Sequence, residues 1–236
     1  MSERFSRQLA LVAGGTGGLG SAVSLAFLEE GATVVVTHRK QSEFEALRDA
    51  AGPHGSRLVE GHSVDVTNDA AVHQLVSSIV AKHGRLDVMT NAVGGYAAGW
   101  KLWETQASVL EQMLSLNLYS GFILLRSVVP AMLRQGRGAI VNVASTAAID
   151  HAASAAAYAG SKAAAVAMVA SLAADLKGTG IRANSILPRI IDTQANRKAM
   201  PDADFSKWPK PRDIAEVILF LCSDAAKLIN GTAIPV

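Results

Sequence analysis

At 236 residues the chain is long enough for one large α/β domain or two smaller ones, and half of its residues are apolar, which excludes a disordered protein. A formal net charge of +2, without any block of lysine or arginine, makes nucleic acid and membrane surfaces poor candidates for a partner. The single cysteine, Cys222, excludes an intrachain disulfide and fits a reducing compartment. The amino terminus is charged and no apolar run reaches roughly 18 residues, so we expect a cytoplasmic protein.

The first predicted strand, Leu9–Ala13, runs directly into a glycine-rich loop, which is followed by apolar helical spacing over residues 21–30. Strand, glycine loop and helix in this order predict a phosphate-binding turn. The glycines allow the backbone to approach a ligand closely, and free amides at the helix start attract a pyrophosphate.

Two glycine spacings fit this loop. Gly15, Gly17 and Gly20 match Gly-x-Gly-x-x-Gly, whereas Gly14, Gly18 and Gly20 match Gly-x-x-x-Gly-x-Gly. The alternative is a glycine-rich turn that binds nothing. We expect a dinucleotide here, held by Gly14, Thr16, Gly17, Gly18, Leu19 and Gly20.

The second predicted strand, 33–37, leads into His38-Arg39-Lys40. An acidic residue usually holds the adenosine ribose of NAD at this place, and no carboxylate stands in these three positions. A guanidinium binds a 2′-phosphate through paired hydrogen bonds, so we expect NADP, with NAD as the second choice. His38 and Arg39 are the predicted contacts, and the alternative is a basic loop that faces solvent.

Strands and helices alternate along the rest of the chain, which predicts a doubly wound parallel seven-stranded sheet of the Rossmann type with helices on both faces. We expect a single domain over 1-236. The remaining predicted strands cover 58–66, 86–90, 139–144, 181–187 and 232–236, and helices are predicted at 43–51, at 68–83 and in segments through 116 and 134.

A possible catalytic group follows the strand at 139–144. Ser145 lies at the carboxyl end of that strand, where open α/β sheets bind ligands. Tyr158 and Lys162 are four residues apart, so on a helix they share one face. An ammonium one turn away lowers the pKa of a phenol, which makes Tyr158 a candidate general acid or base. The alternative is a solvated pair without a role.

With these pieces placed, the chain resembles the short-chain dehydrogenase/reductase family over nearly its whole length. The glycine loop follows the family's Thr-Gly-x-x-x-Gly-x-Gly motif with Ala13 in place of threonine, and Asn91-Ala92 falls on its Asn-Asn-Ala-Gly motif, with Thr90 and Val93 replacing two members. Residues 188–193 match the Pro-Gly-x-x-x-Thr segment, with Arg189 in place of glycine. The resemblance implies further cofactor contacts at Asp65, Val66, Asn91, Ala92, Val93, Tyr158, Lys162, Pro188, Ile191 and Thr193.

The same resemblance implies a catalytic tetrad of Asn117, Ser145, Tyr158 and Lys162. Tyr158 would protonate the substrate oxygen, and Ser145 would hydrogen-bond that oxygen. Lys162 would lower the tyrosine pKa and bind the nicotinamide ribose, while Asn117 would hold a water that links Lys162 to solvent. The implied protein acts on a small-molecule carbonyl or alcohol and forms a homodimer or homotetramer. No metal site is predicted, since the scattered histidines lack ligand spacing.

A narrower resemblance covers residues 193–208 and Gly94-Gly95-Tyr96-Ala97, which look like the corresponding segments of dihydropteridine reductases. Three hypotheses therefore stand. The leading one is an NADP-preferring oxidoreductase acting on a carbonyl or secondary alcohol. The others are reduction of a quinonoid pterin and a non-catalytic dinucleotide-binding sensor.

Overall fold

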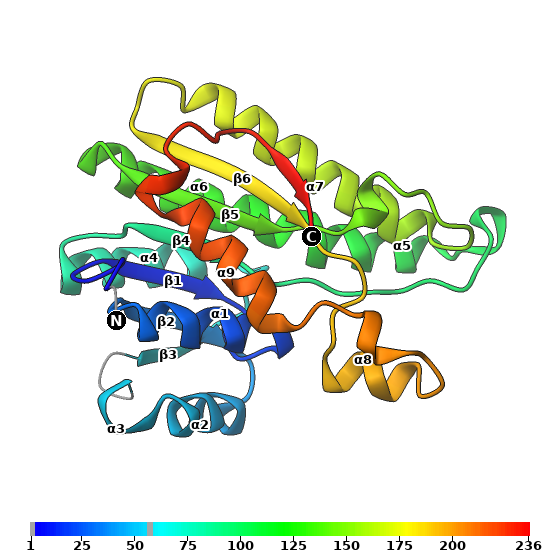
Figure 1. The fold of residues 1–236 in the computed structure, drawn as a ribbon. Helices are drawn as coiled ribbons and strands as arrows, with labels where there is room; N and C mark the ends of the chain where they lie inside the picture. The colour runs from blue at the N-terminus through cyan, green and yellow to red at the C-terminus, as the bar shows by residue number, and fades with distance from the viewer. Residues whose placement is uncertain (1–2, 56–58) are drawn as a thin grey trace.

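A computed structural model describes residues 3–55 and 59–236, and seven parallel strands form one sheet in the order β3-β2-β1-β4-β5-β6-β7 (Figure 1). The order reverses between β1 and β4, which is the arrangement of a doubly wound fold. The predicted fold is therefore confirmed. The strands are β1 (Leu9–Ala13), β2 (Thr33–His38), β3 (Val59–Ser63), β4 (Val88–Asn91), β5 (Gly138–Val143), β6 (Ile181–Leu187) and β7 (Ala233–Pro235).

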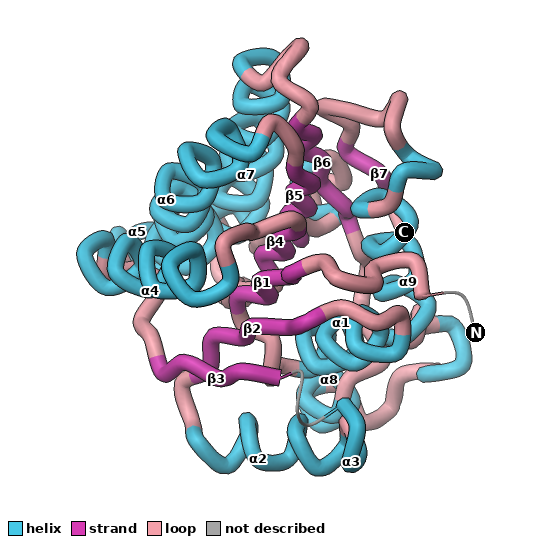
Figure 2. The backbone as a smooth tube through the Cα atoms, turned by 90° about the vertical axis from the view of Figure 1, so that its left-hand side faces the viewer, coloured by secondary structure: helices cyan, strands magenta, loops and turns pink. Residues whose placement is uncertain are grey.

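Helices cover both faces of this sheet, which Figure 2 shows nearly edge-on. One face carries α1 (Gly18–Glu29), α2 (Gln41–Ala50) and α9 (Pro211–Cys222). The other carries α4 (Asp69–His83), α5 (Ala107–Leu114), α6 (Ser120–Gln135) and α7 (Ala156–Asp175). Short helical segments include α3 (Gly52–Gly55), η4 (Thr146–Ala148) and α8 (Gln194–Ala199).

Strand β1 shows why the sequence reads as a continuous apolar run. Ala10 and Val12 belong to the apolar cluster on the α1 face, while Leu9, Leu11 and Ala13 belong to the cluster on the α4 face. Successive side chains of a strand point to opposite faces, and both faces are covered here, so both sets must be apolar.

Boundaries differ from the prediction where polar ends are involved. The strand predicted over 58–66 is observed as Val59–Ser63, with its first predicted residue outside the described residues, and Asp65 and Val66 lie in the following loop. The helix predicted from residue 21 begins at Gly18. Glycine usually favours a loop, but here Gly17 is the N-cap and Gly18 and Gly20 lie in the first turn of the helix. Between α5 and α6 the chain forms a π-helical segment, Ser115–Tyr119, that periodicity did not predict.

Within the described residues, two helical stretches, Ala107–Gln135 and Ala156–Asp175, are long and apolar enough for a membrane span, with mean hydropathy of 1.4 and 1.3. These two helices correct the expectation that no apolar stretch of the chain is long enough to span a membrane. Core helices of a soluble protein pass the same test, and both stretches here lie along one face of the sheet (Figure 2).

The parallel register brings four strand positions into one row near the carboxyl edge. Ala13 pairs with Asn91, Asn91 with Asn142, and Asn142 with Ser185. The loops that follow β1, β4, β5 and β6 therefore leave the sheet side by side, at the switch point where ligands bind in open α/β sheets.

Candidate active site

The glycine loop after β1 has a backbone shape that depends on its glycines. Gly14 lies at φ +70°, and its amide donates to Thr37 Oγ1 at 2.9 Å. A Cβ on Gly20 would lie 2.0 Å from the Gly14 carbonyl oxygen, and one on Gly18 would lie 2.8 Å from Thr193 Cγ2. A Cβ on Gly17 would meet only the Gly14 oxygen, at 3.4 Å. The structure thus favours the spacing Gly14, Gly18 and Gly20.

Gly15 is required for a different reason. A Cβ there would lie 2.5 Å from Val36 Cγ1 on the neighbouring strand, so this glycine lets the loop pack on β2. It does not open the loop to a ligand.

The start of α1 is free to bind an anion. Gly17 occupies the N-cap without any side-chain hydrogen bond, and the first turn carries no acidic residue. The leading amides of a helix have no partner within the helix, and the helix dipole places partial positive charge there. Together with the glycine contacts, this is a cradle that fits a pyrophosphate.

At the end of β2, beside the glycine loop, His38 and Arg39 differ in exposure. His38 is only 5% exposed, and its ring stacks on Phe44 with centroids 5.2 Å apart. Arg39 is exposed. The predicted His38 contact is therefore limited to its main chain, whereas the Arg39 guanidinium is available to a ligand.

A carboxylate does approach the loop, from helix α2. Glu43 accepts a hydrogen bond from the Thr16 hydroxyl at 3.3 Å and forms an ion pair with Lys40 at 3.3 Å. The sequence analysis did not select Glu43, because it lies on a helix and not at the end of the strand.

The segment after β3 supplies the predicted Asp65-Val66 pair. Val66 is buried, and the exposed Asp65 carboxylate accepts hydrogen bonds from the Thr67 amide and hydroxyl. These two hydrogen bonds hold the pKa of Asp65 below its usual value.

The segment after β4 is fixed by the side chain of Asn91, which is 2% exposed. Its amide donates to Asn142 Oδ1 on β5 at 3.0 Å, and its oxygen accepts from the Val93 amide at 3.1 Å. The Ala92 amide donates to the Ala13 carbonyl at 2.9 Å. Asn91, Ala92 and Val93 therefore lie beside the glycine loop, where Val93 Cγ2 would be 3.2 Å from a Cβ on Gly14.

Ser145 and Tyr158 meet at the carboxyl end of β5. Ser145 caps the turn η4 and accepts a hydrogen bond from the Ala147 amide, and its hydroxyl also donates to the phenol of the half-buried Tyr158. Burial raises the pKa of Tyr158, and the hydrogen bond from Ser145 offsets part of that rise.

Lys162 is buried one turn further along α7, with 5% exposure. Its ammonium donates to the Val143 carbonyl at 3.1 Å, and burial lowers the pKa of Lys162 to about 8. The predicted lowering of the Tyr158 pKa by Lys162 is wrong for the protein without ligands. The ammonium is turned toward strand β5, and burial of the phenol dominates.

Asn117 lies in the π-helical segment, and its side chain holds the backbone of Gly95. Its oxygen accepts from the Gly95 amide at 2.9 Å, and its amide donates to the Gly95 carbonyl at 3.1 Å and to Ser161 Oγ at 3.0 Å. The side chain is thus bound to protein, and the predicted water contact of Asn117 stays a prediction. A Cβ on Gly94 would lie 2.9 Å from Asn117 Oδ1 and 3.1 Å from Lys162 Nζ.

Residues 188–193 follow β6 and reach the glycine loop. Pro188 is buried, Ile191 packs against the apolar cluster on the α1 face, and Thr193 caps α8 by accepting from the Asn196 amide at 3.2 Å. Thr193 also touches Gly18, which joins this segment to the glycine loop. Arg189 is not among the residues with positive φ, so the backbone accepts arginine without strain.

One aromatic contact was missed by the sequence analysis. The Tyr96 ring meets the Tyr158 ring edge-on, with centroids 4.8 Å apart and an interplanar angle of 77°. The position of Tyr96 directly after Gly94-Gly95 indicates that it lies near the site, but the sequence cannot show which ring it contacts.

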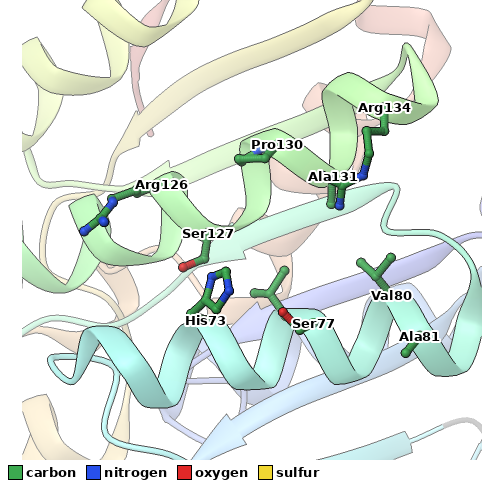
Figure 3. Close-up of a pocket in the computed structure, with 10 residues that line it drawn as sticks. His73, Ser77, Val80, Ala81, Arg126, Ser127, Pro130, Ala131 and Arg134 are labelled. Atoms are coloured by element: carbon green, nitrogen blue, oxygen red, sulfur yellow. The ribbon is translucent and has the colours of Figure 1, made fainter.

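A groove lies away from the predicted site residues. It has a volume of about 340 Å³ and lies between α4 and α6, with His73, Ser77, Arg126 and Arg134 among its lining residues (Figure 3). None of the predicted site residues lines it.

Comparison with known proteins agrees with this geometry. A family model described as Enoyl-(Acyl carrier protein) reductase matches residues 13–236. The chain is 31% identical over 240 residues to 3-oxoacyl-[acyl-carrier-protein] reductase FabG of Thermotoga maritima, covering 98% of this chain and 96% of the relative. It is 33% identical over 238 residues to D-threitol dehydrogenase of Mycolicibacterium smegmatis, covering 97% and 90%.

Solved structures agree as well. A putative short-chain dehydrogenase/reductase from Burkholderia xenovorans superposes with a TM-score of 0.86 at 33% identity, covering 99% of this chain and 96% of that one. The chain belongs to the short-chain dehydrogenase/reductase family and is an oxidoreductase of that family.

Structural neighbours bind either of two dinucleotides. An NAD⁺-bound xylitol dehydrogenase superposes with a TM-score of 0.89 at 25% identity, covering 98% of both chains. ElxO with NADP bound superposes with a TM-score of 0.91 at 25% identity, covering 97% of this chain and 96% of that one.

Proposed function

We propose that this protein is an NADP-preferring oxidoreductase that transfers hydride between a nicotinamide and a carbonyl or secondary alcohol, with Tyr158 as the general acid and base. The observation that carries the proposal is the placement of Ser145 and the half-buried Tyr158 at the carboxyl end of β5, with the buried Lys162 one helical turn beyond the tyrosine. These residues lie at the same edge of the sheet as a loop and helix start whose shape fits a pyrophosphate.

The cradle determines where the cofactor lies. Gly14, Gly18 and Gly20 admit the pyrophosphate to the start of α1. Arg39 receives the adenosine end, and Pro188, Ile191 and Thr193 contact the nicotinamide end. When bound, a reduced nicotinamide supplies the hydride that adds to the carbonyl carbon.

Tyr158 donates its proton to the carbonyl oxygen as the carbon accepts the hydride, so that the products are the alcohol and the oxidised dinucleotide. Burial keeps the phenol protonated at neutral pH, so proton transfer requires stabilisation of the phenolate by neighbouring groups. Ser145 donates a hydrogen bond to the same oxygen, where negative charge develops. Lys162 would bind the nicotinamide ribose, and its ammonium would stabilise the phenolate that Tyr158 becomes when it gives up its proton. Solvent would then return a proton to Tyr158 through a water held at Asn117.

The preference for NADP rests on Arg39, which is exposed at the end of β2 without an acidic residue beside it on the strand. Glu43 would favour NAD, because its carboxylate lies at the glycine loop. This carboxylate is already bound to the Thr16 hydroxyl and the Lys40 ammonium, so we expect the Arg39 guanidinium to bind a 2′-phosphate.

We also propose that the protein is a cytoplasmic homodimer or homotetramer that pairs through α5, α6 and α7. Large apolar side chains are exposed along the first two helices. The outer face of α7 adds exposed alanines, which allow another helix to approach closely. These larger side chains are Leu110, Tyr119, Phe122 and Leu133.

The test follows NADPH absorbance with a panel of ketones, sugars, β-ketoacyl thioesters and quinonoid dihydropterin. We expect turnover of a carbonyl compound, and we expect Tyr158→Phe to lower kcat by about 10² to 10⁴ while NADPH still binds. Unchanged kcat in that variant contradicts the role of Tyr158. Turnover of the dihydropterin alone favours the pterin reductase, and saturable NADPH binding without any turnover favours the sensor.

A further inference from the structure

Tyr96 occupies an unusual place at the mouth of this site. Its ring lies edge-on against the Tyr158 ring at 4.8 Å, yet 72% of the residue is exposed. One part of the Tyr96 ring therefore contacts Tyr158, the proposed acid. Most of its remaining surface is open to a molecule bound beside Tyr158.

The backbone on both sides of Tyr96 is anchored. On one side, Asn117 holds the amide and the carbonyl of Gly95. On the other, the Gly99 amide donates to the Ser154 carbonyl at 2.8 Å, and both of these residues have positive φ. The loop is thus tied to the turn that precedes Tyr158, and the Tyr96 ring is positioned before any substrate arrives.

The loops after β5 and β6 expose apolar side chains beside the polar Asp150, His151 and Arg189. Ile149, after η4, is 53% exposed, and Ile190, after β6, is 44% exposed. The charged neighbours Arg189 and Asp150 pair with each other at 3.8 Å. These loops therefore offer apolar surface at the carboxyl ends of β5 and β6.

We propose that Tyr96 determines substrate specificity, and that it selects ketones with an aromatic or alicyclic ring attached to the carbonyl carbon. This inference rests on the proposed function, in which Tyr158 and Ser145 hold the carbonyl oxygen. A substituent on the carbonyl carbon then lies beside the Tyr96 ring. A flat apolar ring packs on an aromatic side chain and buries its exposed surface, whereas a short aliphatic chain gains little from that contact.

The experiment compares acetophenone with butan-2-one as substrates, with NADPH as the reductant, in the wild type, Tyr96→Ala and Tyr96→Phe. We expect Tyr96→Ala to lower the ratio of kcat/KM for acetophenone over butan-2-one about tenfold, mainly through KM, since aromatic contacts supply that order of binding. Tyr96→Phe keeps the ring and therefore keeps the ratio.

Trp103→Ala is the matched control. Trp103 is an aromatic residue of the same loop, 79% exposed, and its ring contacts Lys101. We expect this variant to keep the ratio. The thermal midpoint and the NADPH dissociation constant of each variant show whether the fold and the cradle are intact.

The outcomes separate the two proposals. An unchanged ratio in Tyr96→Ala, an equal loss in Trp103→Ala, or wild-type reduction of butan-2-one without acetophenone overturns the role of Tyr96 and leaves the oxidoreductase intact. A wild-type protein that reduces no carbonyl compound overturns the proposed function, and the inference with it.

Discussion

Two side chains that lie one turn apart on α7 have very different surroundings. Tyr158 is half-buried and hydrogen-bonded to Ser145, while Lys162 is nearly enclosed and donates to the Val143 carbonyl. Burial opposes ionisation of both groups, so the tyrosine pKa is raised and the lysine pKa is lowered. Burial, and not the neighbouring charge, therefore dominates the pKa of both groups.

Lys162→Met should stabilise the protein at neutral pH. Lowering the lysine pKa from 10.5 to about 8 corresponds to about 3 kcal/mol against folding when the group is charged. The folded protein releases this proton before the unfolded chain does, so wild-type stability rises between about pH 8 and 10.5. We expect the variant to gain about 2 kcal/mol at pH 7, allowing for the lost hydrogen bond, and to lose that advantage as pH rises.

Urea unfolding at pH 7 and at pH 9.5 measures this difference. Lys177→Met, at an exposed position just beyond α7, is the control and should follow the wild type at both values. A stability difference for Lys162→Met that is the same at both pH values would show that the lysine is not buried in its charged form.

Arg39→Ala should change cofactor preference. A guanidinium that holds a 2′-phosphate contributes charge-assisted hydrogen bonds, so its loss should lower the ratio of kcat/KM for NADPH over NADH by about ten- to a hundredfold. Steady-state kinetics with both cofactors checks this. Arg48→Ala, which removes an exposed guanidinium on α2, should leave the ratio nearly unchanged. If the ratio stays constant in Arg39→Ala, the case for NADP is lost.

At the scale of elements, the turn from β1 to α1 combines a structural and a binding requirement. Gly20 belongs to the helix, but it is where the helix backbone crosses closest to the loop, and the Gly14 oxygen occupies the space of its missing side chain. The same close approach leaves the leading amides of α1 open to a ligand.

Gly20→Ala should therefore weaken both folding and cofactor binding. The methyl group would meet backbone, which cannot move aside easily, so we expect a loss of about 1–3 kcal/mol of stability and a weaker NADPH affinity. Gly17→Ala is the matched control for stability, because its Cβ would lie 3.4 Å from the nearest atom and its φ of −71° suits alanine. Chemical denaturation and NADPH fluorescence titration measure the two effects. Equal stability of the two variants would contradict this account of Gly20.

At the scale of the whole molecule, the two faces of the sheet are covered differently. Helix α7 is apolar around much of its circumference, and together with α5 and α6 it presents exposed apolar residues. A helix that is apolar all round is usually buried, so a second copy of the chain is the occupant we propose for this surface.

Phe122→Glu should reduce the oligomer to a smaller species. Phe122 is 45% exposed and stacks near Tyr119, so a carboxylate there would be buried without a partner in the proposed interface. Light scattering after size-exclusion chromatography measures the mass. Leu102→Glu, at a position 70% exposed in the loop after β4, is the control and should keep the wild-type mass. A Phe122→Glu protein of unchanged mass would place the interface elsewhere.

Much of the fold could be predicted from the chain alone. Apolar runs such as Leu9–Ala13 and Ile181–Leu187 mark buried parallel strands, and the helices between them follow from apolar spacing and from caps such as Asn68. The positions of Ser145, Tyr158 and Lys162 could be predicted too, because a strand end and a helical repeat place them together. The π-helical turn at Asn117 could not, since an extra residue in one helical turn leaves no trace in periodicity.

The sequence by itself determined the order of strands and helices along the chain, the glycine-rich turn before the first helix and the residue types at the candidate site, because these depend on local spacing. Only the tertiary structure decided which of the glycines are sterically required, that Lys162 faces Val143, that His38 is covered by Phe44 and that Tyr96 meets Tyr158. Each of these depends on burial and on contacts between segments far apart in the chain. Spacing along one segment carries no information about them.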